Sequence, residues 1–172
     1  MKMFVLRPPT FTPFKGPILF LAGPIQGAAD WQHEAIKWFR RQQHGDFSIA
    51  SPRRIGRESQ KFGNRKFASQ VGWESHHLRL AAEQGVVMFW LAREENHCCY
   101  RAFAQTSRFE IAEWMVRAQL SRVRLVVGID PKFSGRRYLL QRFAEACPAI
   151  PILDSLETTC SLAHRLITSL DF

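Results

Sequence analysis

Blocks of apolar residues alternate with longer amphipathic stretches along this chain of 172 residues. The apolar blocks are four to seven residues long, which is strand length, and Gly, Pro or charged residues bound them. They predict five strands, at residues 17–22, 47–50, 86–92, 123–129 and 149–153. The stretches between them predict five helices: one capped by Asp30 that carries Trp31, Ala35, Trp38 and Phe39, one with Val71, Ser75, Leu78 and Ala82 on one face, and three at 107–120, 136–146 and 156–170.

The order of these elements predicts an α/β fold. Strands that alternate with helices form a parallel sheet covered on both faces, and such buried strands are apolar throughout, as residues 86–92 are. We expect a doubly wound, five-stranded parallel sheet in a single domain at 17–172, preceded by an extended, Pro-rich arm at 1–16. Ligands of such sheets bind beyond the carboxyl ends of the strands. The candidate binding segments are therefore 23–30, 93–107 and 130–137.

The sequence argues against a membrane protein and against a zinc protein. No apolar run reaches the roughly 18–20 residues that a membrane-spanning helix needs, and the apolar stretch at 3–6 is too short for a signal peptide. The four cysteines, at positions 98, 99, 147 and 160, lack the paired spacing of a zinc site. We expect a soluble, cytoplasmic protein with no metal, no cofactor and no membrane partner.

The net charge of the chain indicates an anionic partner. The chain has 24 Lys and Arg against 15 Asp and Glu, a formal net charge of +9, which favours either nucleic acid or a small phosphorylated ligand. A net of +5 falls in the polar segment 51–68, where six Lys and Arg accompany one acidic residue, Glu58. We predict that this segment is a long functional or mobile loop.

The segment Gly23–Gly27 follows the first predicted strand. Its two glycines permit a sharp turn and a close approach of the backbone to a ligand. The spacing is not G-x-G-x-x-G, and the chain contains no G-x-x-x-x-G-K-[ST]. A plain strand-to-helix turn and a ligand-binding loop are equally compatible with this spacing.

Glu110 lies near the start of the helix predicted at 107–120, three residues after Ser107. This S-x-x-E spacing is that of a capping box, in which Glu110 only holds the first helical turn. The same position also suits chemistry, because a carboxylate at the positive end of a helix stays ionised and faces the carboxyl edge of the sheet. An ionised, positioned carboxylate is what attacks a sugar anomeric carbon. Glu113 is interpreted as a solvated helix carboxylate.

Two further polar clusters are interpreted as structural from their spacing alone. Glu74 stands beside His76 and His77, and adjacent histidines do not share a helix face, so they do not form a chelating pair. The Cys98-Cys99 pair has only His97, its neighbour in sequence, as a candidate base.

Four segments, taken in order, resemble the nucleoside 2-deoxyribosyltransferase-like family. They are ILFLAGPIQG at 18–27, Trp73-Glu74 with the VVMFWL strand at 86–91, TSRFEIA at 106–112, and VGIDP at 127–131 with Arg136 and Arg137 after it. The resemblance implies a flavodoxin-like fold and a retaining mechanism. In that mechanism a glutamate attacks the anomeric carbon of a deoxynucleoside and displaces the base, and a second base or water then resolves the glycosyl-enzyme.

The resemblance also implies roles for individual residues. Glu110 matches the nucleophile, and the loop that lines the nucleobase pocket is matched by Gly23, Pro24 and Ile25. Ser107, in the same segment as Glu110, is also predicted to bind substrate.

Two more acidic residues are assigned by the resemblance, and three positions depart from it. In the sequence comparison, Glu74 falls near a family residue that contacts the base or the sugar, and Asp130 falls near a family position that reaches a neighbouring subunit's site. Relatives are homo-oligomers, so we expect this protein to form a homo-oligomer. The departures from the family pattern are Ala104, Ala112 and Glu113, and they leave the acceptor and the 2-deoxy preference open.

Two functions from different classes follow. The first is an enzyme that cleaves or exchanges the N-glycosidic bond of a nucleoside or nucleotide, with Glu110 as nucleophile; the basic segment 51–68 then suggests a ligand with a 5′-phosphate, since guanidinium groups grip phosphate bidentately. The second is a non-catalytic nucleotide- or nucleic-acid-binding module that uses this segment, with Glu110 as a cap. No nucleic-acid motif is present, so we favour the enzyme and a small-molecule ligand.

Overall fold

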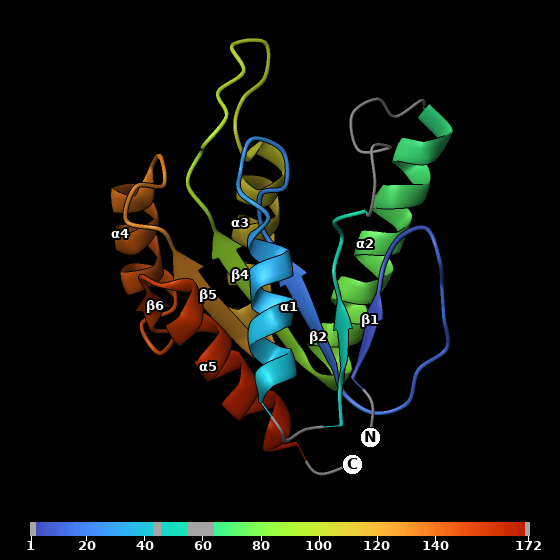
Figure 1. The fold of residues 1–172 in the computed structure, drawn as a ribbon. Coiled ribbons are helices and arrows are strands. Elements are labelled where there is room, and N and C mark those ends of the chain that lie inside the picture. The colour runs from blue at the N-terminus through green and yellow to red at the C-terminus, as the bar shows by residue number, and fades with distance from the viewer. Residues whose placement is uncertain (1–2, 43–45, 55–63, 171–172) are drawn as a thin grey trace.

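The computed structural model describes residues 3–42, 46–54 and 64–170. It contains one parallel sheet of six strands with helices on both faces (Figure 1). The strands are β1 (Phe4–Leu6), β2 (Ile18–Ala22), β3 (Ser48–Ala50), β4 (Val86–Leu91), β5 (Leu125–Ile129) and β6 (Ile152–Leu153). The helices are α1 (Trp31–Arg41), α2 (Asn64–Gln84), α3 (Gln105–Leu120), α4 (Arg136–Ala146) and α5 (Leu156–Thr168). None of these helices is both long and apolar enough to cross a membrane.

The strand order places a topological switch point in the middle of the sheet. The order is β1-β3-β2-β4-β5-β6, so the chain winds from β2 to β3 on one side and then crosses to β4 on the other. The carboxyl ends of β2 and β4 are therefore neighbours from which the following loops diverge, and ligands of doubly wound sheets bind at such a point. This arrangement confirms the expected flavodoxin-like fold.

The sheet has six strands rather than the five that we expected. The additional strand, β1, lies within the Pro-rich arm and pairs in parallel with the outer edge of β3, with Phe4 opposite Ser48. Only three residues take part, too few for a strand signal in the sequence, and pairing with β3 supplies the missing stabilisation. Beyond the strand, the Ser51 amide donates to the Leu6 carbonyl (3.0 Å), which extends the contact past Ala50.

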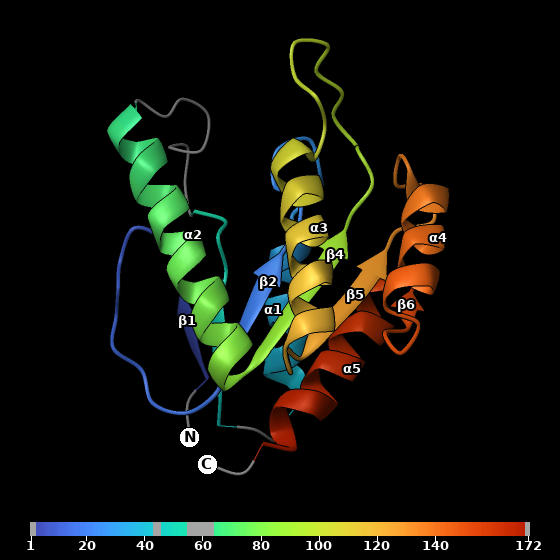
Figure 2. The same cartoon turned by 180° about the vertical axis from the view of Figure 1, so that it is seen from behind.

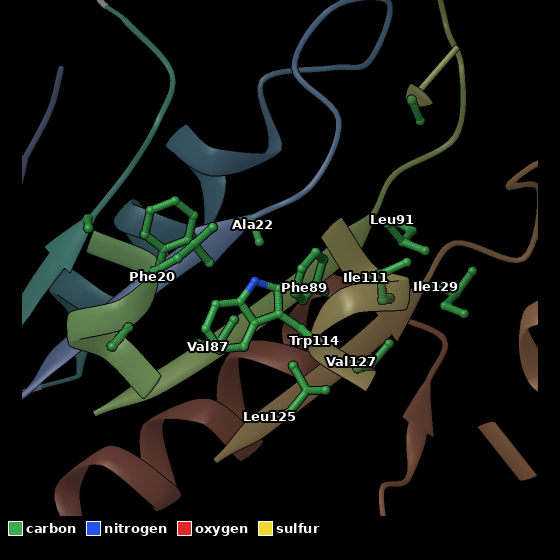
Figure 3. Packing of buried hydrophobic residues seen from close by; sticks show 14 of the residues in the cluster. Phe20, Ala22, Val87, Phe89, Leu91, Ile111, Trp114, Leu125, Val127 and Ile129 are labelled. Atoms are coloured by element: carbon green, nitrogen blue, oxygen red, sulfur yellow. The ribbon is translucent and has the colours of Figure 1, made fainter. Parts of the chain in front are cut away.

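Alternate side chains of the central strands pack into two separate hydrophobic cores, one on each face of the sheet. In β4, Phe89 and Leu91 face α2, α3 and α4, whereas Met88 and Trp90 face α1 and α5. Figure 2 shows α2 and α3 lying side by side over one face of the sheet. On that face Trp114 of α3 lies over the aromatic and branched side chains of β2, β4 and β5 (Figure 3). This buried indole fixes α3, and with it Glu110 one turn earlier, against the sheet.

Helix α2 begins earlier than predicted, and its buried face is only partly the predicted one. It starts at Asn64, so residues 64–68 are helical rather than part of the predicted loop at 51–68. The predicted Leu78 is buried, but Val71 is exposed, and the other buried residues are Trp73, His77 and Ala81. The reason is the bulk of the Trp73 indole, which enters the core and on which the His77 ring stacks with 4.0 Å between centroids. His77 is thus a core residue, and burial lowers its pKa.

The predicted capping box of α3 does not form. The helix begins at Gln105, and its N-cap is Ala104, which has a left-handed backbone (φ 55°) and no capping side chain. Ser107 is therefore the third helical residue and Glu110 the sixth. The interpretation of Glu110 as a cap is wrong, because the left-handed turn at Ala104 starts the helix one turn before the S-x-x-E spacing predicts.

Candidate active site

The loop after β2 crosses directly over the end of β4. Gly23 has a φ of 145°, and a side chain there would clash with the Trp90 carbonyl and the Trp31 ring. Only glycine allows this crossing, so this residue determines where the two diverging loops leave the switch point. The Trp31 indole donates to the Pro24 carbonyl (2.8 Å) and holds the turn from the side of α1.

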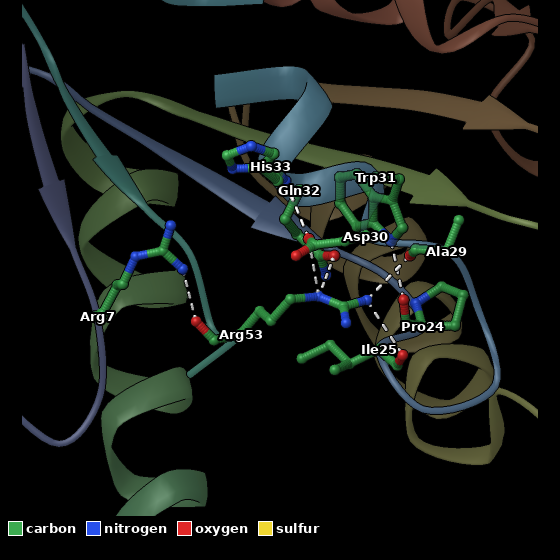
Figure 4. A network of polar contacts seen from close by, with 9 residues as sticks. All are labelled: Arg7, Pro24, Ile25, Ala29, Asp30, Trp31, Gln32, His33 and Arg53. Carbon is green, nitrogen blue, oxygen red and sulfur yellow. Dashed lines mark hydrogen bonds and ion pairs between the residues drawn. The ribbon is translucent and has the colours of Figure 1, made fainter. Parts of the chain in front are cut away.

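The rest of the β2–α1 loop is held by protein donors. The Gly27 carbonyl accepts from the amides of Glu95 (2.7 Å) and Asn96 (3.0 Å), in the loop after β4. The carbonyls of Ile25 and Ala29 accept from the guanidinium of Arg53 (3.1 and 2.9 Å; Figure 4). Several carbonyl groups of this loop are thus bonded to the protein, the exposed Gln26 side chain accepts from Arg101, and the partly exposed Ile25 offers an apolar side chain. Such a side chain suits the face of a planar base.

Glu110 lies on α3 and is partly buried. Its pKa is raised to about 8, first by burial, then by the negative charge of Glu74 and then by that of Glu113. A carboxyl group that is held near the sheet edge in so unfavourable an environment is unusual on a helix surface, and such perturbed groups gather at functional sites. The expectation that Glu110 stays ionised in the first turn of its helix is therefore wrong: it is the sixth residue of α3, and burial and the neighbouring carboxylates favour its acid form.

Glu74, from the middle of α2, is the neighbouring carboxyl whose charge acts most on Glu110. It is also partly buried, and burial raises its pKa, while a hydrogen bond from Gln70 and the charge of Arg54 act in the opposite direction. Glu74 Oε1 accepts from Gln70 Nε2 at 2.7 Å. The sequence places these carboxyl groups 36 positions apart, and the packing of α2 and α3 brings them close enough for the Glu74 charge to raise the pKa of Glu110.

Glu113 behaves as predicted, as a solvated helix carboxylate. Its Oε1 lies 2.7 Å from Arg117 Nη2, and the Arg117 guanidinium lies over the Trp114 ring. One turn beyond the Glu74–Glu110 pair, an open hollow of about 370 Å³ runs between the two helices, and Glu113, Leu78 and Trp114 are among its lining residues.

Ser107 and Asp130 have structural surroundings. Ser107 is only 3% exposed and lies beneath the surface of the site. Asp130 follows β5 and shapes the turn into α4: its Oδ1 accepts from the Lys132 amide (2.8 Å), and its own amide donates to the Leu91 carbonyl (3.1 Å). The substrate-binding roles of both residues stay predictions.

The basic segment 51–68 divides into parts with different surroundings. Arg53 is held against the β2–α1 loop, and Arg54 Nε donates to Gln70 Oε1 (2.8 Å). Arg65 and Lys66 lie in the first turns of α2 and are exposed. Residues 55–63, with two of the six basic residues among them, lie outside the described residues.

A comparison with protein families agrees with this geometry. The profile of the family described as nucleoside 2-deoxyribosyltransferase like matches residues 16–133, more than half of the chain. The chain belongs to this family. No curated protein matches it significantly. The matched stretch runs from just before β2 to just after β5 and contains Glu74, Glu110 and the loop at Gly23.

The sequence did not predict that Gln70 belongs to this deoxyribosyltransferase-like site. It also did not predict that Arg54 lies beside Gln70. Both lie in or beside what looks like one polar loop in the sequence, so the predicted helix begins after them. The signal was nevertheless present: Gln70 and Glu74 stand four apart, the spacing of neighbours on one helix face. It becomes readable only once α2 is known to start at Asn64.

Proposed function

We propose that this member of the family breaks or exchanges the N-glycosidic bond of a nucleoside or nucleotide, with Glu110 as the nucleophile and with retention at the anomeric carbon. The observation that supports it is the pair of carboxyl groups, Glu110 on α3 and Glu74 on α2, which are partly buried and close enough for the charge of Glu74 to act on Glu110. Two interacting carboxyl groups hold one proton over a range of pH, so one is an anion while the other is an acid.

The first step uses both groups. An oxygen of the Glu110 carboxylate attacks C1′ and forms a C–O bond while the C1′–N bond breaks, and the electron pair of that bond leaves with the base. In the resting pair the proton lies mainly on Glu110, because burial and then the Glu74 charge raise its pKa to about 8, so this proton passes to Glu74 before the attack. The departing base needs a proton, and Glu74, now in its acid form, supplies it. Negative charge therefore moves from Glu110 to Glu74 as the glycosyl-enzyme forms, and the pair carries one negative charge before and after the step.

The second step restores the pair. Water or a second base attacks C1′ from the face that the first base left, its proton passes to Glu74, and the C1′–O bond to Glu110 breaks. Two inversions at C1′ give net retention. The step with water is hydrolysis, and the step with a base is transfer.

The test is product analysis with 2′-deoxynucleosides and their 5′-monophosphates, each with and without an acceptor base. The wild type is compared with Glu110→Gln, which keeps the size of the side chain, and with Glu113→Gln as the matched control. We expect turnover in the wild type and the control, none with Glu110→Gln, and a covalent glycosyl adduct by intact mass only when Glu110 is present. Normal turnover by Glu110→Gln rejects the proposal. Oligonucleotide binding that weakens steeply with salt, without any turnover, would support the binding module instead.

We also propose that the ligand carries a 5′-phosphate. Within 51–68, Arg53 is committed to the β2–α1 loop. The other basic residues of this segment that the structure describes are Arg54, beside Gln70, and the exposed Arg65 and Lys66, and they support this proposal. Equal kcat/KM for nucleosides and their monophosphates counts against it.

The expected homo-oligomer has support on α3, the helix that carries Glu110. Its outward side exposes Phe109 (78%), Val116 (46%) and Leu120 (82%). A helix that is apolar on its core side and also on its outer side is typical of an interface. We propose that a second copy covers this apolar strip.

A further inference from the structure

Three polar groups beside the carboxyl pair converge on one amide, the side chain of Gln70. Its Nε2 donates to Glu74 Oε1 (2.7 Å) and to the Pro52 carbonyl (2.9 Å). Its Oε1 accepts from Arg54 Nε (2.8 Å). Both N–H donors and the carbonyl oxygen of the amide are thus in use, in a partly buried position.

The surroundings fix which way the amide points. In the reverse orientation its NH₂ group would meet the Arg54 N–H, and its oxygen would meet the Glu74 carboxyl and the Pro52 carbonyl. The contacts with Arg54 and Pro52 would then pair donor with donor and acceptor with acceptor, whatever the protonation state of Glu74, so only one orientation satisfies all three partners. Gln70 also joins separate elements, because Pro52 and Arg54 belong to the segment that leaves β3 whereas Glu74 lies one turn further along α2.

We propose that Gln70 is a positioning residue of the glycosyl-transfer site: it holds the Glu74 carboxyl near Glu110 and links it to Arg54. The inference deepens the proposed function and rests on it, since the placement of Glu74 matters to catalysis only if Glu110 attacks the sugar. Gln70 occupies one oxygen of Glu74 and leaves the other for the proton that the departing base receives.

An amide is suited to this task because it carries no charge. A lysine at this position would bind Glu74 as an anion and keep it from holding a proton. An amide N–H donates to the oxygen of either a carboxylate or a carboxylic acid, so the orientation persists while the protonation state changes.

The contact has an electrostatic consequence that separates it from simple packing. The Gln70 hydrogen bond lowers the pKa of Glu74 against the effect of burial, and Arg54 acts in the same direction. The charge of Glu74 in turn raises the pKa of Glu110, as does that of Glu113. Loss of the Gln70 amide should therefore raise the pKa of Glu74 and lower that of Glu110, so the two groups shift in opposite directions.

Two variants and a matched control test the proposal. Gln70→Leu keeps the approximate size and removes all three hydrogen bonds, and Gln70→Lys keeps a donor but adds charge. The matched control is Gln84→Leu, which makes the same Gln-to-Leu substitution at an exposed position at the end of α2. Folding is checked by circular dichroism for each variant, and each is measured in two ways, by steady-state kinetics and by ¹³C NMR titration of the glutamate carboxyl groups. The Glu74 and Glu110 signals are assigned with Glu74→Gln and Glu110→Gln.

With Gln70→Leu we expect kcat/KM to fall of the order of ten- to a hundredfold, mainly in kcat, because Glu74 is no longer held at the departing base. The Glu74 signal should titrate at higher pH than in the wild type, and the Glu110 signal at lower pH. With Gln70→Lys the Glu74 signal should titrate at lower pH and kcat should fall as well. Gln84→Leu should match the wild type in both measurements.

The two measurements separate failure of this inference from failure of the proposed function. If the wild type turns over substrate and Gln70→Leu retains its kcat and both titrations, Gln70 is not a positioning residue. The proposal is equally overturned if Gln70→Leu is misfolded and Gln70→Lys folds with an unchanged Glu74 titration and unchanged kcat. If the wild type has no glycosyl activity, the proposed function fails and this inference with it, even where the titrations shift as expected.

Discussion

The guanidinium of Arg53 lies 3.0 Å from Oδ1 of Asp30, and the same carboxyl oxygen accepts from the His33 amide at the start of α1. Arg53 Nε also donates to Gln32 Oε1 (2.9 Å), and the guanidinium donates to the carbonyls of Ile25 and Ala29. One arginine from the end of β3 thus ties together the N-cap of α1 and the loop that crosses the switch point. A residue that the charge pattern assigned to ligand binding is a structural clamp.

The first prediction concerns this clamp. Arg53→Ala should lower the free energy of unfolding by about 2–3 kcal/mol, because it leaves the buried Gln32 amide and the two loop carbonyls without their donor. Arg53→Lys should recover only part of this loss, since an ammonium cannot match the fork of a guanidinium. Urea denaturation measures both.

The control for the clamp is Arg122→Ala, which removes an exposed arginine after α3. It should change the free energy of unfolding by no more than about 0.5 kcal/mol. Equal stability of Arg53→Ala and Arg122→Ala would show that the contacts around Asp30 contribute nothing.

Most of the sheet was predictable because its central strands are short apolar runs with clear boundaries. The runs at β2 and β4 match the predicted strands to within a residue, since every position in them is buried. The three-residue β1 was not predictable, because its stability comes from the edge of β3 rather than from its own composition.

The site was predictable only in part, and the missing part depends on where helices begin. Resemblance singled out Glu110 and Glu74, but nothing local in the sequence says that they lie close together across two helices. The S-x-x-E spacing favoured a cap at Ser107, and the left-handed residue that starts α3 instead is an alanine, which rarely adopts that conformation. The contact of Gln70 with Glu74 was hidden because the start of α2 looks like a loop in the sequence.

The second prediction uses the raised pKa of Glu110 as a property of folding. A carboxyl group whose pKa is about 8 when folded and about 4.5 when unfolded favours the folded state at low pH, and this contribution is lost as the pH rises through 8. Relative to Glu110→Gln, the wild type should therefore lose roughly 3–4 kcal/mol of stability between pH 5 and pH 9. Urea denaturation of both proteins at these two pH values measures the difference. A constant difference would show that Glu110 is not held in an unfavourable environment.

The third prediction is the pH dependence of activity. The reactive form of the Glu74–Glu110 pair holds one proton, so kcat/KM should depend on pH as a bell-shaped curve. It should fall above about pH 8, where the pair loses this remaining proton. Glu74→Gln removes the repulsion and the proton donor together. Its rate should be much lower and should rise with pH to a plateau, with a midpoint below 8, since burial and Glu113 still act on Glu110, and with no fall on the alkaline side. An alkaline fall that persists in Glu74→Gln would assign it to another group.

The fourth prediction tests the apolar strip of α3. Val116→Lys combined with Leu120→Arg places two charges where a second copy would have to be buried, and an unpaired buried charge costs more than such an interface can supply. We expect the wild type to elute as an oligomer in size-exclusion chromatography with light scattering, and the double variant as a monomer with an unchanged circular dichroism spectrum. Phe4→Lys changes an exposed apolar residue at the far edge of the sheet and should leave the oligomer intact. If the double variant stays oligomeric, the interface lies elsewhere, and if the wild type is already a monomer, the exposed side chains of α3 have some other partner.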